Sequence, residues 1–432
     1  MLRDLLIVAL FAVGALLALR GPFYALLLYL WIAYFRPEDW VWNDFVRSLS
    51  LSWFVGVYVL ISFGLSRERM PMSGRTALLF MFLAHSLVST LFSSHFTYAW
   101  PYWVDFAKSL LITYLIVALS TDRSRFRLVL LVIALSLGLE AAKQGWVELF
   151  LNPGAKNYND IAHLGSDNEV AVGMFMLVPV LGALARTTDK RSVAYLLRFI
   201  MIGVLYRGLV TYSRGGFLAC GVMALLYFLR TPGKLRYLFA VVAIAALILP
   251  VLPTAYWERM ETIGASPEER DTSSKGRLHF WDVALVMAND RPILGVGHNA
   301  FNAAYDTYDR SGGELYGTAR SVHSAWFGLL AELGYPGLLM FLTILALALR
   351  ACSRVRRRAV EGSIPNDLGE YATALSTSLA VFAVGGTFLT FQYKEILWHF
   401  AGLALALEGL AVRTAPAEAA EGEGRPLPVA KT

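Results

Sequence analysis

Charged residues are scarce in this 432-residue sequence, where Asp, Glu, Lys and Arg together make up 16%. Soluble domains carry about a quarter. The deficit extends along the whole chain and excludes a water-soluble enzyme of this length. A disordered chain is excluded by the opposite excess, because 57% of the residues are hydrophobic and 11 Trp, 20 Tyr and 26 Phe are present. The two cysteines, Cys220 in an apolar run and Cys352 in a basic loop, predict neither a disulfide framework nor a thiolate metal site.

The sequence also lacks the common signatures of metal, nucleotide and hydrolase sites. It has no H-E-x-x-H, no cysteine–histidine pair at ligand spacing, and no Walker or serine-hydrolase motif. Gly295 and Gly297 form a GVG turn that no third glycine completes as a dinucleotide fingerprint. Asp167, Asn168 and Glu169 could hold a hard cation, but a polar helix start explains them more simply. We therefore expect no metal and no cofactor.

Long apolar runs dominate the sequence instead. The first run follows a charged N-terminus, as in a signal peptide, but a second run follows at once without a small-residue cleavage site. We therefore expect a retained membrane segment there. At about 20 residues per crossing, the runs predict an all-α polytopic membrane protein with about 12 transmembrane helices. The candidate runs lie near residues 4–19, 22–35, 50–65, 76–93, 104–120, 126–148, 168–186, 195–211, 215–230, 236–253, 322–349, 368–391 and 394–411.

Basic residues are concentrated in five short loops between these runs. The positive-inside rule places all five loops in the cytoplasm. Three other segments are then placed outside, namely 36–49, 151–167 and 254–321. The net charge of +6 is therefore a topological bias, and we expect no nucleic-acid partner. The basic loops are 66–75, 121–127, 186–198, 230–236 and 350–358.

The longest outer segment, residues 254–321, divides the chain. Apolar residues at helical spacing in 278–290 predict an amphipathic helix that packs on the bundle or on the membrane surface. A segment of this length in a compact fold favours a small functional lid. We expect a first transmembrane part over 1–253, the lid over 254–321 and a second transmembrane part over 322–412. The low-complexity residues 413–432 predict a disordered cytoplasmic tail.

Two arginines near the predicted outer face require an explanation, because charge in lipid is costly. Arg214 lies between two apolar runs in TYSRGGFLAC, where a glycine pair would let a bulky ligand approach. Arg207 lies seven residues earlier, which is two helical turns along the same face. Together they indicate an anion site. Alternatively, Arg214 snorkels to lipid headgroups, and Arg207 forms a buried ion pair with Asp167 or Glu169.

Histidines occur near the same face. His323 precedes a long apolar run, where it could act as a base kept neutral by the helix dipole, or simply cap the helix. Arg277 precedes the amphipathic stretch, and His298 follows the GVG turn as a loop histidine of little diagnostic value. Glu332 should face roughly away from His323, so we expect it to be a structural partner inside the bundle. The glycines and proline in ELGYPG predict a kink or a close helix contact.

Three motifs carry a family resemblance through their order in the chain. They are SRGG at 213–216, GR…FW..AL.M..DRPILGVG at 276–297, and VHSAWFGLLAELGYPG at 322–337. This order resembles the O-antigen ligase superfamily of bacterial inner-membrane proteins, over roughly residues 160–345 in motifs and the whole chain in hydropathy. The family pattern has S-R-[GA], [GS]-R before PxxGxG, and H-[NS]…E-x-G-x-x-G. AYFRPEDW at 33–40 also resembles a subset of the family named for O-glycosylation, which leaves the acceptor open.

The resemblance implies a metal-independent glycosyltransferase of the GT-C type in the bacterial inner membrane, with its active site facing the periplasm. Such an enzyme takes a glycan from undecaprenyl pyrophosphate and transfers it to a sugar hydroxyl of lipid A–core in lipopolysaccharide biosynthesis. Carried over by motif, Arg214 and Arg277 bind the pyrophosphate and His323 activates the hydroxyl. Ser324 follows His323 where the family commonly has Asn, so any role of that Asn has no counterpart here. Further candidate substrate-binding residues are Arg207, Asp167, Asn168 and His298.

Other functions remain open at this stage. A glycan polymerase of the same superfamily and a protein O-oligosaccharyltransferase acting on Ser or Thr share these motifs. A transporter for the lipid-linked glycan is a different class. It predicts charges along a path through the membrane midplane and inverted repeats, whereas the charges here cluster near the outer face and no repeat is evident.

Overall fold

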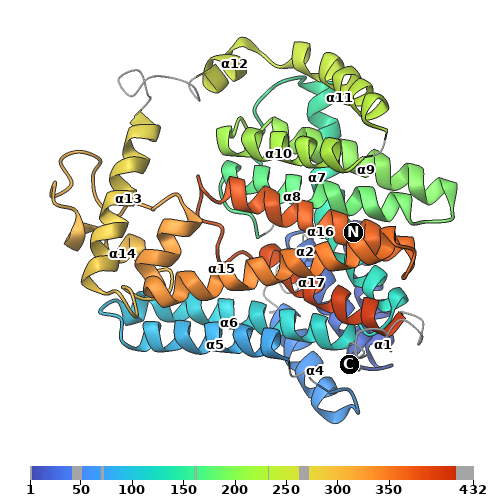
Figure 1. The fold of residues 1–432 in the computed structure, drawn as a ribbon, viewed down its shortest axis with the longest axis horizontal. Helices are drawn as coiled ribbons and strands as arrows, with labels where there is room; N and C mark the ends of the chain where they lie inside the picture. The colour runs from blue at the N-terminus through green and yellow to red at the C-terminus, as the bar shows by residue number, and fades with distance from the viewer. Residues whose placement is uncertain are drawn as a thin grey trace, which may run out of the picture.

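The computed structural model describes residues 2–40, 51–69, 73–159, 161, 163–231, 233–261 and 272–414. All regular secondary structure in these ranges is helical, as the sequence predicted (Figure 1). The first helices are α1 (Leu2–Ala18), α2 (Pro22–Phe35), η1 (Pro37–Trp40), α4 (Leu51–Leu65), α5 (Gly74–Leu91), α6 (Phe96–Leu119), α7 (Arg123–Leu151), α8 (Asp167–Arg186) and α9 (Arg191–Leu209). The others are α10 (Arg214–Arg230), α11 (Lys234–Ile248), η2 (Leu249–Val251), α12 (Thr254–Glu261), α13 (Thr272–Asp290), α14 (Phe301–Tyr308), α15 (Ala325–Val360), α16 (Asn366–Gly385) and α17 (Glu395–Thr414).

Six helices in the described ranges are long and apolar enough to cross a membrane, namely α5, α6, α8, α9, α15 and α17. Three further helices, α1, α2 and α4, are also apolar but shorter. The chain is therefore a multi-pass helical membrane protein. The expected number of about 12 crossings is not confirmed, because several apolar runs form helices shorter than a bilayer crossing requires, such as α11 with 15 residues.

The basic segment 350–358 is helical, although the sequence predicted a loop there. α15 continues through it to Val360, and Cys352 is buried inside the helix. Arginine and alanine are good helix formers, so charge alone does not end the helix, and the chain turns only at Gly362 with φ 73°. The 36 residues of α15 amount to about 54 Å of helix, against about 30 Å of hydrocarbon. α15 therefore extends well beyond a membrane core. Both cysteines are free, as expected.

Ion pairs join the basic segments at one end of the helix bundle, which we call the basic end. Glu408 of α17 pairs with Arg75, the second residue of α5, and with Arg354 of α15. Arg125 of α7 pairs with Glu68 at 3.0 Å. These contacts bring together segments that the sequence had assigned to one side of the membrane.

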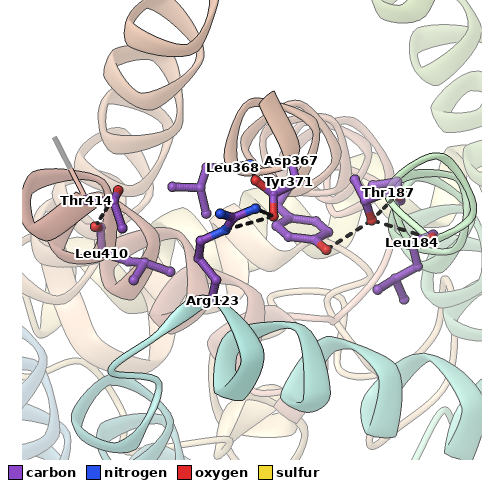
Figure 2. Close-up of polar contacts among 9 residues, drawn as sticks. Arg123, Leu184, Thr187, Asp367, Leu368, Tyr371, Leu410 and Thr414 are labelled. Atoms are coloured by element: carbon purple, nitrogen blue, oxygen red, sulfur yellow. Dashed lines mark hydrogen bonds and ion pairs between the residues drawn. The ribbon is translucent and has the colours of Figure 1, made fainter. Parts of the chain in front are cut away.

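The neighbouring contacts of the basic end are drawn in Figure 2. Arg123, at the start of α7, donates to the carboxylate of Asp367 at the start of α16, with Nη2 and Oδ2 2.8 Å apart. The Thr187 hydroxyl, just after α8, lies 3.0 Å from the hydroxyl of Tyr371. The opposite end of the bundle carries α12, α13 and α14 and is called the lid end (Figure 1). That the basic end is cytoplasmic stays a prediction.

α15 is kinked where the sequence predicted a kink. Gly334 has φ 68° and ψ −174°, a conformation essentially restricted to glycine. The kink exposes backbone groups, and the GVG turn binds them. The amide of Gly297 donates to the carbonyl of Glu332 at 3.1 Å, and the amide of Tyr335 donates to the carbonyl of Pro292 at 2.9 Å. A Cβ on Gly334 would collide with the backbone of Pro292. The DRPILGVG and ELGYPG motifs are therefore two halves of one docking contact.

The amphipathic helix predicted over 278–290 is confirmed as the greater part of α13. The residues expected on its apolar face, among them Phe280, Val283 and Met287, are buried. They pack with α14 and with Val322 at the entry to α15, and Figure 1 shows α13 and α14 standing together at the lid end. Within the predicted lid, residues 262–271 lie outside the described residues, as do 415–432 of the predicted tail.

Candidate functional site

His323 lies in the segment that joins the lid to α15. Its backbone is left-handed, with φ 48°, which is uncommon for a residue that has a Cβ and often marks functional sites. The next residue, Ser324, caps α15 by accepting a hydrogen bond from the amide of Phe327. The imidazole ring lies beside Phe280 of α13, with ring centroids 6.3 Å apart. The side chain is therefore held between the lid and the bundle.

Burial lowers the pKa of His323, and the positive charges of Arg277 and Arg320 lower it further. The neutral imidazole, which a general base needs, is thus favoured at neutral pH. The direction agrees with the sequence prediction, but burial and two arginines cause it, where the sequence had suggested the helix dipole. Arg277 of α13 therefore acts electrostatically on His323, although the two are far apart in the sequence.

Arg214 is the first residue of α10 and is only 8% exposed. α9 and α10 are separate helices, so Arg207 and Arg214 are not two turns apart on one face, and that prediction is wrong. The chain turns between them because Tyr212 adopts φ 59° and the Ser213 hydroxyl accepts a hydrogen bond from the Gly216 amide at 3.0 Å. A serine N-cap stabilises a helix start, and this one ends any continuous helix through the two arginines.

The segment between α16 and α17 joins the starts of α10 and α15. The amide of Ala325 donates to the carbonyl of Gly386 at 2.7 Å. Two residues further, Phe388 packs against Gly215, where a Cβ would lie 3.1 Å from the Cβ of Phe388. The candidate phosphate arginine of α10 and the candidate base before α15 therefore flank one short segment of chain at the lid end.

Arg207 is fully buried in the last turn of α9. Its Nε donates to Oε1 of Gln144 at 2.8 Å, and its Nη2 donates to the carbonyl of Asn159 at 2.6 Å. These bonds connect α9 with α7 and with the segment before α8. They give Arg207 a structural task, while its expected contact with an anion stays a prediction.

Asp167 and Asn168 form the first turn of α8. Asp167 pairs with Lys156 at 2.7 Å, and Glu169 accepts a hydrogen bond from the helix-capping backbone and pairs with Lys394 at 3.0 Å. Asn168 is half-buried. This is the polar helix start that the sequence favoured. In the part of the chain that the structure describes, no three His, Cys, Asp or Glu side chains gather as a metal site.

A cavity of about 1360 Å³ lies at the lid end between α2, α6, α7, α8 and the segment before α17. Ser321 and Val322, the two residues before His323, form part of its wall. His298, Asn299 and Phe301 line it from the lid. Aromatic and carboxylate side chains predominate in the rest of the lining, including Tyr34, Trp40, Tyr98, Phe106, Asp105 and Glu395.

His298 lies in the wall of this cavity and is 1% exposed, although the sequence suggested an ordinary loop histidine. Its ring packs against Phe106 and Tyr393, with centroid distances of 4.9 Å and 3.9 Å, and those two rings also contact each other. Neither ring nitrogen meets a hydrogen-bond partner among the described residues. Burial lowers the pKa of His298 to about 3, so the imidazole is neutral.

Glu332, which the sequence predicted to be a structural partner inside the bundle, also lines the cavity. It is 2% exposed. Its carboxylate accepts hydrogen bonds from the Tyr393 hydroxyl at 2.9 Å, from Nε2 of Gln392 at 3.2 Å and from the Phe301 amide at 3.4 Å. These bonds make Glu332 a structural partner inside the bundle, as the sequence predicted, and hold its carboxylate at the cavity wall.

Four residues, Gln392–Glu395, were not predicted from the sequence to belong to a site. All four line the cavity, and Glu395 accepts a hydrogen bond from the Ser109 hydroxyl at 3.0 Å. A signal was present in the sequence, because the polar run QYKE separates two apolar runs close to the end of the chain. Two adjoining membrane helices need only a short turn to connect them. A run of four polar side chains at such a turn therefore indicates that these side chains have a role in a binding site or in packing.

The fold and this polar region define a multi-pass helical membrane protein with a cavity and an arginine–histidine cluster at its lid end. Residues 196–342 match the family model described as O-antigen ligase, which confirms the resemblance drawn from the three motifs. The match includes Arg214, Arg277, His298, His323 and Glu332. Residues 2–173 match a model described as a family of unknown function. No curated protein matches the chain. The O-antigen ligase family implies glycosyl transfer from lipid-linked glycans.

Proposed function

We propose that the protein is a ligase that transfers a glycan from undecaprenyl pyrophosphate to a sugar hydroxyl of lipid A–core, at the periplasmic face of the bacterial inner membrane. The observation that carries the proposal is the electrostatic environment of His323. Inside the segment that matches the O-antigen ligase family, the charge of Arg277 favours the neutral form of this half-buried histidine. A base and a phosphate-binding cation at one place are what this transfer requires.

In the proposed reaction, the neutral imidazole of His323 accepts the proton of the acceptor hydroxyl. The hydroxyl oxygen forms a bond to the anomeric carbon of the glycan, and the bond from that carbon to the pyrophosphate oxygen breaks. The released charge stays on undecaprenyl pyrophosphate, where the guanidinium groups of Arg214 and Arg277 stabilise it. A positioned base contributes about 10²–10⁴-fold to such a step. Direct displacement inverts the anomeric configuration, and we propose an inverting enzyme of the GT-C type.

The placement of charge in the bundle supports the orientation. The ion-paired basic segments occupy the end opposite the lid, and the positive-inside rule assigns such segments to the cytoplasm. The arginine–histidine cluster and the cavity then face the periplasm. A lipid-linked donor would approach from the membrane, with its pyrophosphate near Arg214 at the start of α10 and Arg277 in the second turn of α13.

A protein O-oligosaccharyltransferase is the second candidate, and a specific observation favours it. The AYFRPEDW stretch resembles the O-glycosylation subset of the family, and Tyr34, Arg36 and Trp40 from this stretch line the cavity. The residues that set the subset apart therefore lie where an acceptor would bind. The acceptor, and not the donor chemistry, is what distinguishes the two candidates.

Reconstitution with a radiolabelled lipid-linked glycan and two acceptors tests the proposal. Rough lipopolysaccharide and a Ser/Thr-containing peptide are offered together, and the labelled acceptor identifies the function. We expect label on the lipopolysaccharide, the same yield after addition of EDTA, and an inverted linkage by product NMR. Label on the peptide alone would support the second candidate, and growth of the lipid-linked glycan without either acceptor would indicate a polymerase.

A further inference from the structure

We propose that the cavity is a saccharide-binding site in which His298 and Glu332 recognise sugar hydroxyl groups, separate from the arginines that hold the pyrophosphate. The proposal rests on the proposed function, because it takes the ligand from the two glycans that the reaction brings together. It gives His298 and Glu332 a joint recognition role that the proposed mechanism does not contain.

The charges around the cavity disfavour a phosphate ligand. Its lining contains three Lys or Arg side chains and six carboxylates among the described residues. Each of these three cations already forms an ion pair with a carboxylate of the same lining, so none is left over to attract an anion. The pairs are Lys394 with Glu169 at 3.0 Å, Lys143 with Glu140 at 2.8 Å and Arg36 with Asp39 at 3.1 Å. A neutral, hydroxyl-rich molecule suits this environment better than a pyrophosphate.

His298 supplies the observation that points to a ligand. A buried imidazole without hydrogen bonds is unfavourable, because water is lost and nothing replaces it. The neutral ring carries one N–H donor and one nitrogen acceptor. A sugar hydroxyl both donates and accepts, so neighbouring hydroxyls can satisfy both nitrogens at once. The packing of Phe106 and Tyr393 against the ring holds its orientation before a ligand arrives.

Glu332 completes the hydrogen-bonding part of the site. Tyr393 and Gln392 donate to its carboxylate and hold it in place, while the cavity lies beside it. Tyr393 contacts both His298 and Glu332, so the three side chains form one fixed group. A site of buried polar groups discriminates strongly against ligands that lack the matching hydroxyls. The aromatic residues of the remaining wall offer flat apolar surface to the C–H faces of a sugar ring.

The position and size of the cavity fit this role. Small-ligand pockets have about 300–1000 Å³, so a volume of about 1360 Å³ admits more than one sugar residue. Ser321 and Val322 line the cavity, and His323 follows them directly. A saccharide bound against this wall would therefore lie beside the segment that carries the candidate base.

Direct binding tests the proposal without relying on turnover. Detergent-purified protein is titrated with two lipid-free probes, the core oligosaccharide released from rough lipopolysaccharide and the glycan released from the lipid carrier, using calorimetry or saturation-transfer NMR. Binding of the core oligosaccharide identifies an acceptor site, and binding of the released glycan identifies a donor site. Either result supports the proposal. Inorganic pyrophosphate is a third probe, and we expect it not to displace the bound saccharide.

Variants at His298 provide the critical comparison. His298→Phe keeps the stacked ring and removes both nitrogens, and we expect at least a tenfold weaker affinity for the saccharide. His298→Asn restores a donor and an acceptor and should recover part of it. His323→Ala should bind the saccharide as the wild type does, even though it does not transfer glycan. If His298→Phe does not fold, Tyr393→Phe removes the hydroxyl that holds Glu332 and should weaken binding in the same direction.

The outcomes separate this proposal from the proposed function. A wild-type protein that transfers glycan but binds neither oligosaccharide would overturn the saccharide site and leave the ligase standing. Unchanged affinity in folded His298→Phe, or displacement of the saccharide by pyrophosphate, would also overturn it. A protein that binds saccharide through His298 but labels no acceptor would retain the site and contradict the ligase.

Discussion

The backbone carbonyl of Glu332 accepts a hydrogen bond from the amide of Gly297 at 3.1 Å, and this bond fixes the lid to the kink of α15. The Glu332 side chain lines the cavity, and His298 follows Gly297 directly in the chain. Glu332 therefore binds the GVG turn through its backbone and contributes its side chain to the polar lining of the cavity. The position of His298 depends on the kink at Gly334.

Gly334→Ala should destabilise the protein. The backbone conformation of Gly334 is essentially restricted to glycine, and an added Cβ would collide with the backbone of Pro292. We therefore expect the free energy of unfolding to fall by about 1–3 kcal/mol and the unfolding temperature to fall with it. Gly221→Ala in α10 is the matched control, since nothing lies within 4 Å of its added Cβ. Thermal unfolding in detergent measures both. Equal midpoints for the two variants would contradict the docking contact described here.

Lysine substitutions should separate the roles of Arg207 and Arg214. Arg207→Lys cannot reproduce the bonds to Gln144 and Asn159, so we expect it to lower the free energy of unfolding by about 3 kcal/mol. Arg214→Lys should reduce the transfer rate by about 10²–10³-fold with a smaller effect on unfolding, because an ammonium cannot bind phosphate in a bidentate way. Unfolding midpoints and initial rates are measured on the same preparations. The reverse pattern would assign the phosphate to Arg207.

The pH dependence of transfer should report the environment of His323. Because its pKa lies below the usual 6.5, the neutral base persists to lower pH, and the acidic limb of kcat/KM should lie below pH 6.5. Arg320→Gln removes one of the charges that lower this pKa, so the limb should move to higher pH. Arg310→Gln changes an exposed arginine that has no part in the shift and should leave the limb in place. If the acidic limb stays at the same pH in Arg320→Gln, His323 is not the base whose titration limits transfer.

Cysteine labelling tests the orientation. In a variant without the native cysteines, Leu315→Cys at the lid end and Val360→Cys at the basic end each place a thiol at an exposed position. A membrane-impermeant maleimide added to spheroplasts should label the first and spare the second until the membrane is opened. The opposite labelling would invert the proposed topology.

The sequence predicted the helical class, the kink of α15 and the amphipathic part of α13, because each has a local cause. Hydropathy, the backbone freedom of glycine and helical periodicity can each be read from a short stretch of sequence. The sequence separated the runs 195–211 and 215–230 but wrongly placed Arg207 and Arg214 on one helical face, although a serine cap and a left-handed tyrosine lie between them. It failed again at 350–358, where charge was taken for a loop although its residues favour helix.

The site could be predicted only in part, since it depends on contacts between distant segments. The sequence singled out His323, Arg214 and Arg277, but it could not show that the 386–388 segment joins two of their helix starts. Burial of His298 arises from Phe106 and Tyr393, which lie far from it along the chain. No local pattern around His298 reports those neighbours, and none around Glu332 shows that it lines the same cavity.

The most direct test of the account is glycan transfer by His323→Asn and His323→Ala in proteoliposomes that contain the lipid-linked donor and rough lipopolysaccharide. Asn tolerates the left-handed backbone at this position, so its unfolding midpoint should stay close to that of the wild type. We predict that both variants bind the donor and lose about 10²–10⁴-fold in the rate of transfer. Transfer at the wild-type rate by folded His323→Asn would contradict the assignment of His323 as the base and, with it, the proposed mechanism.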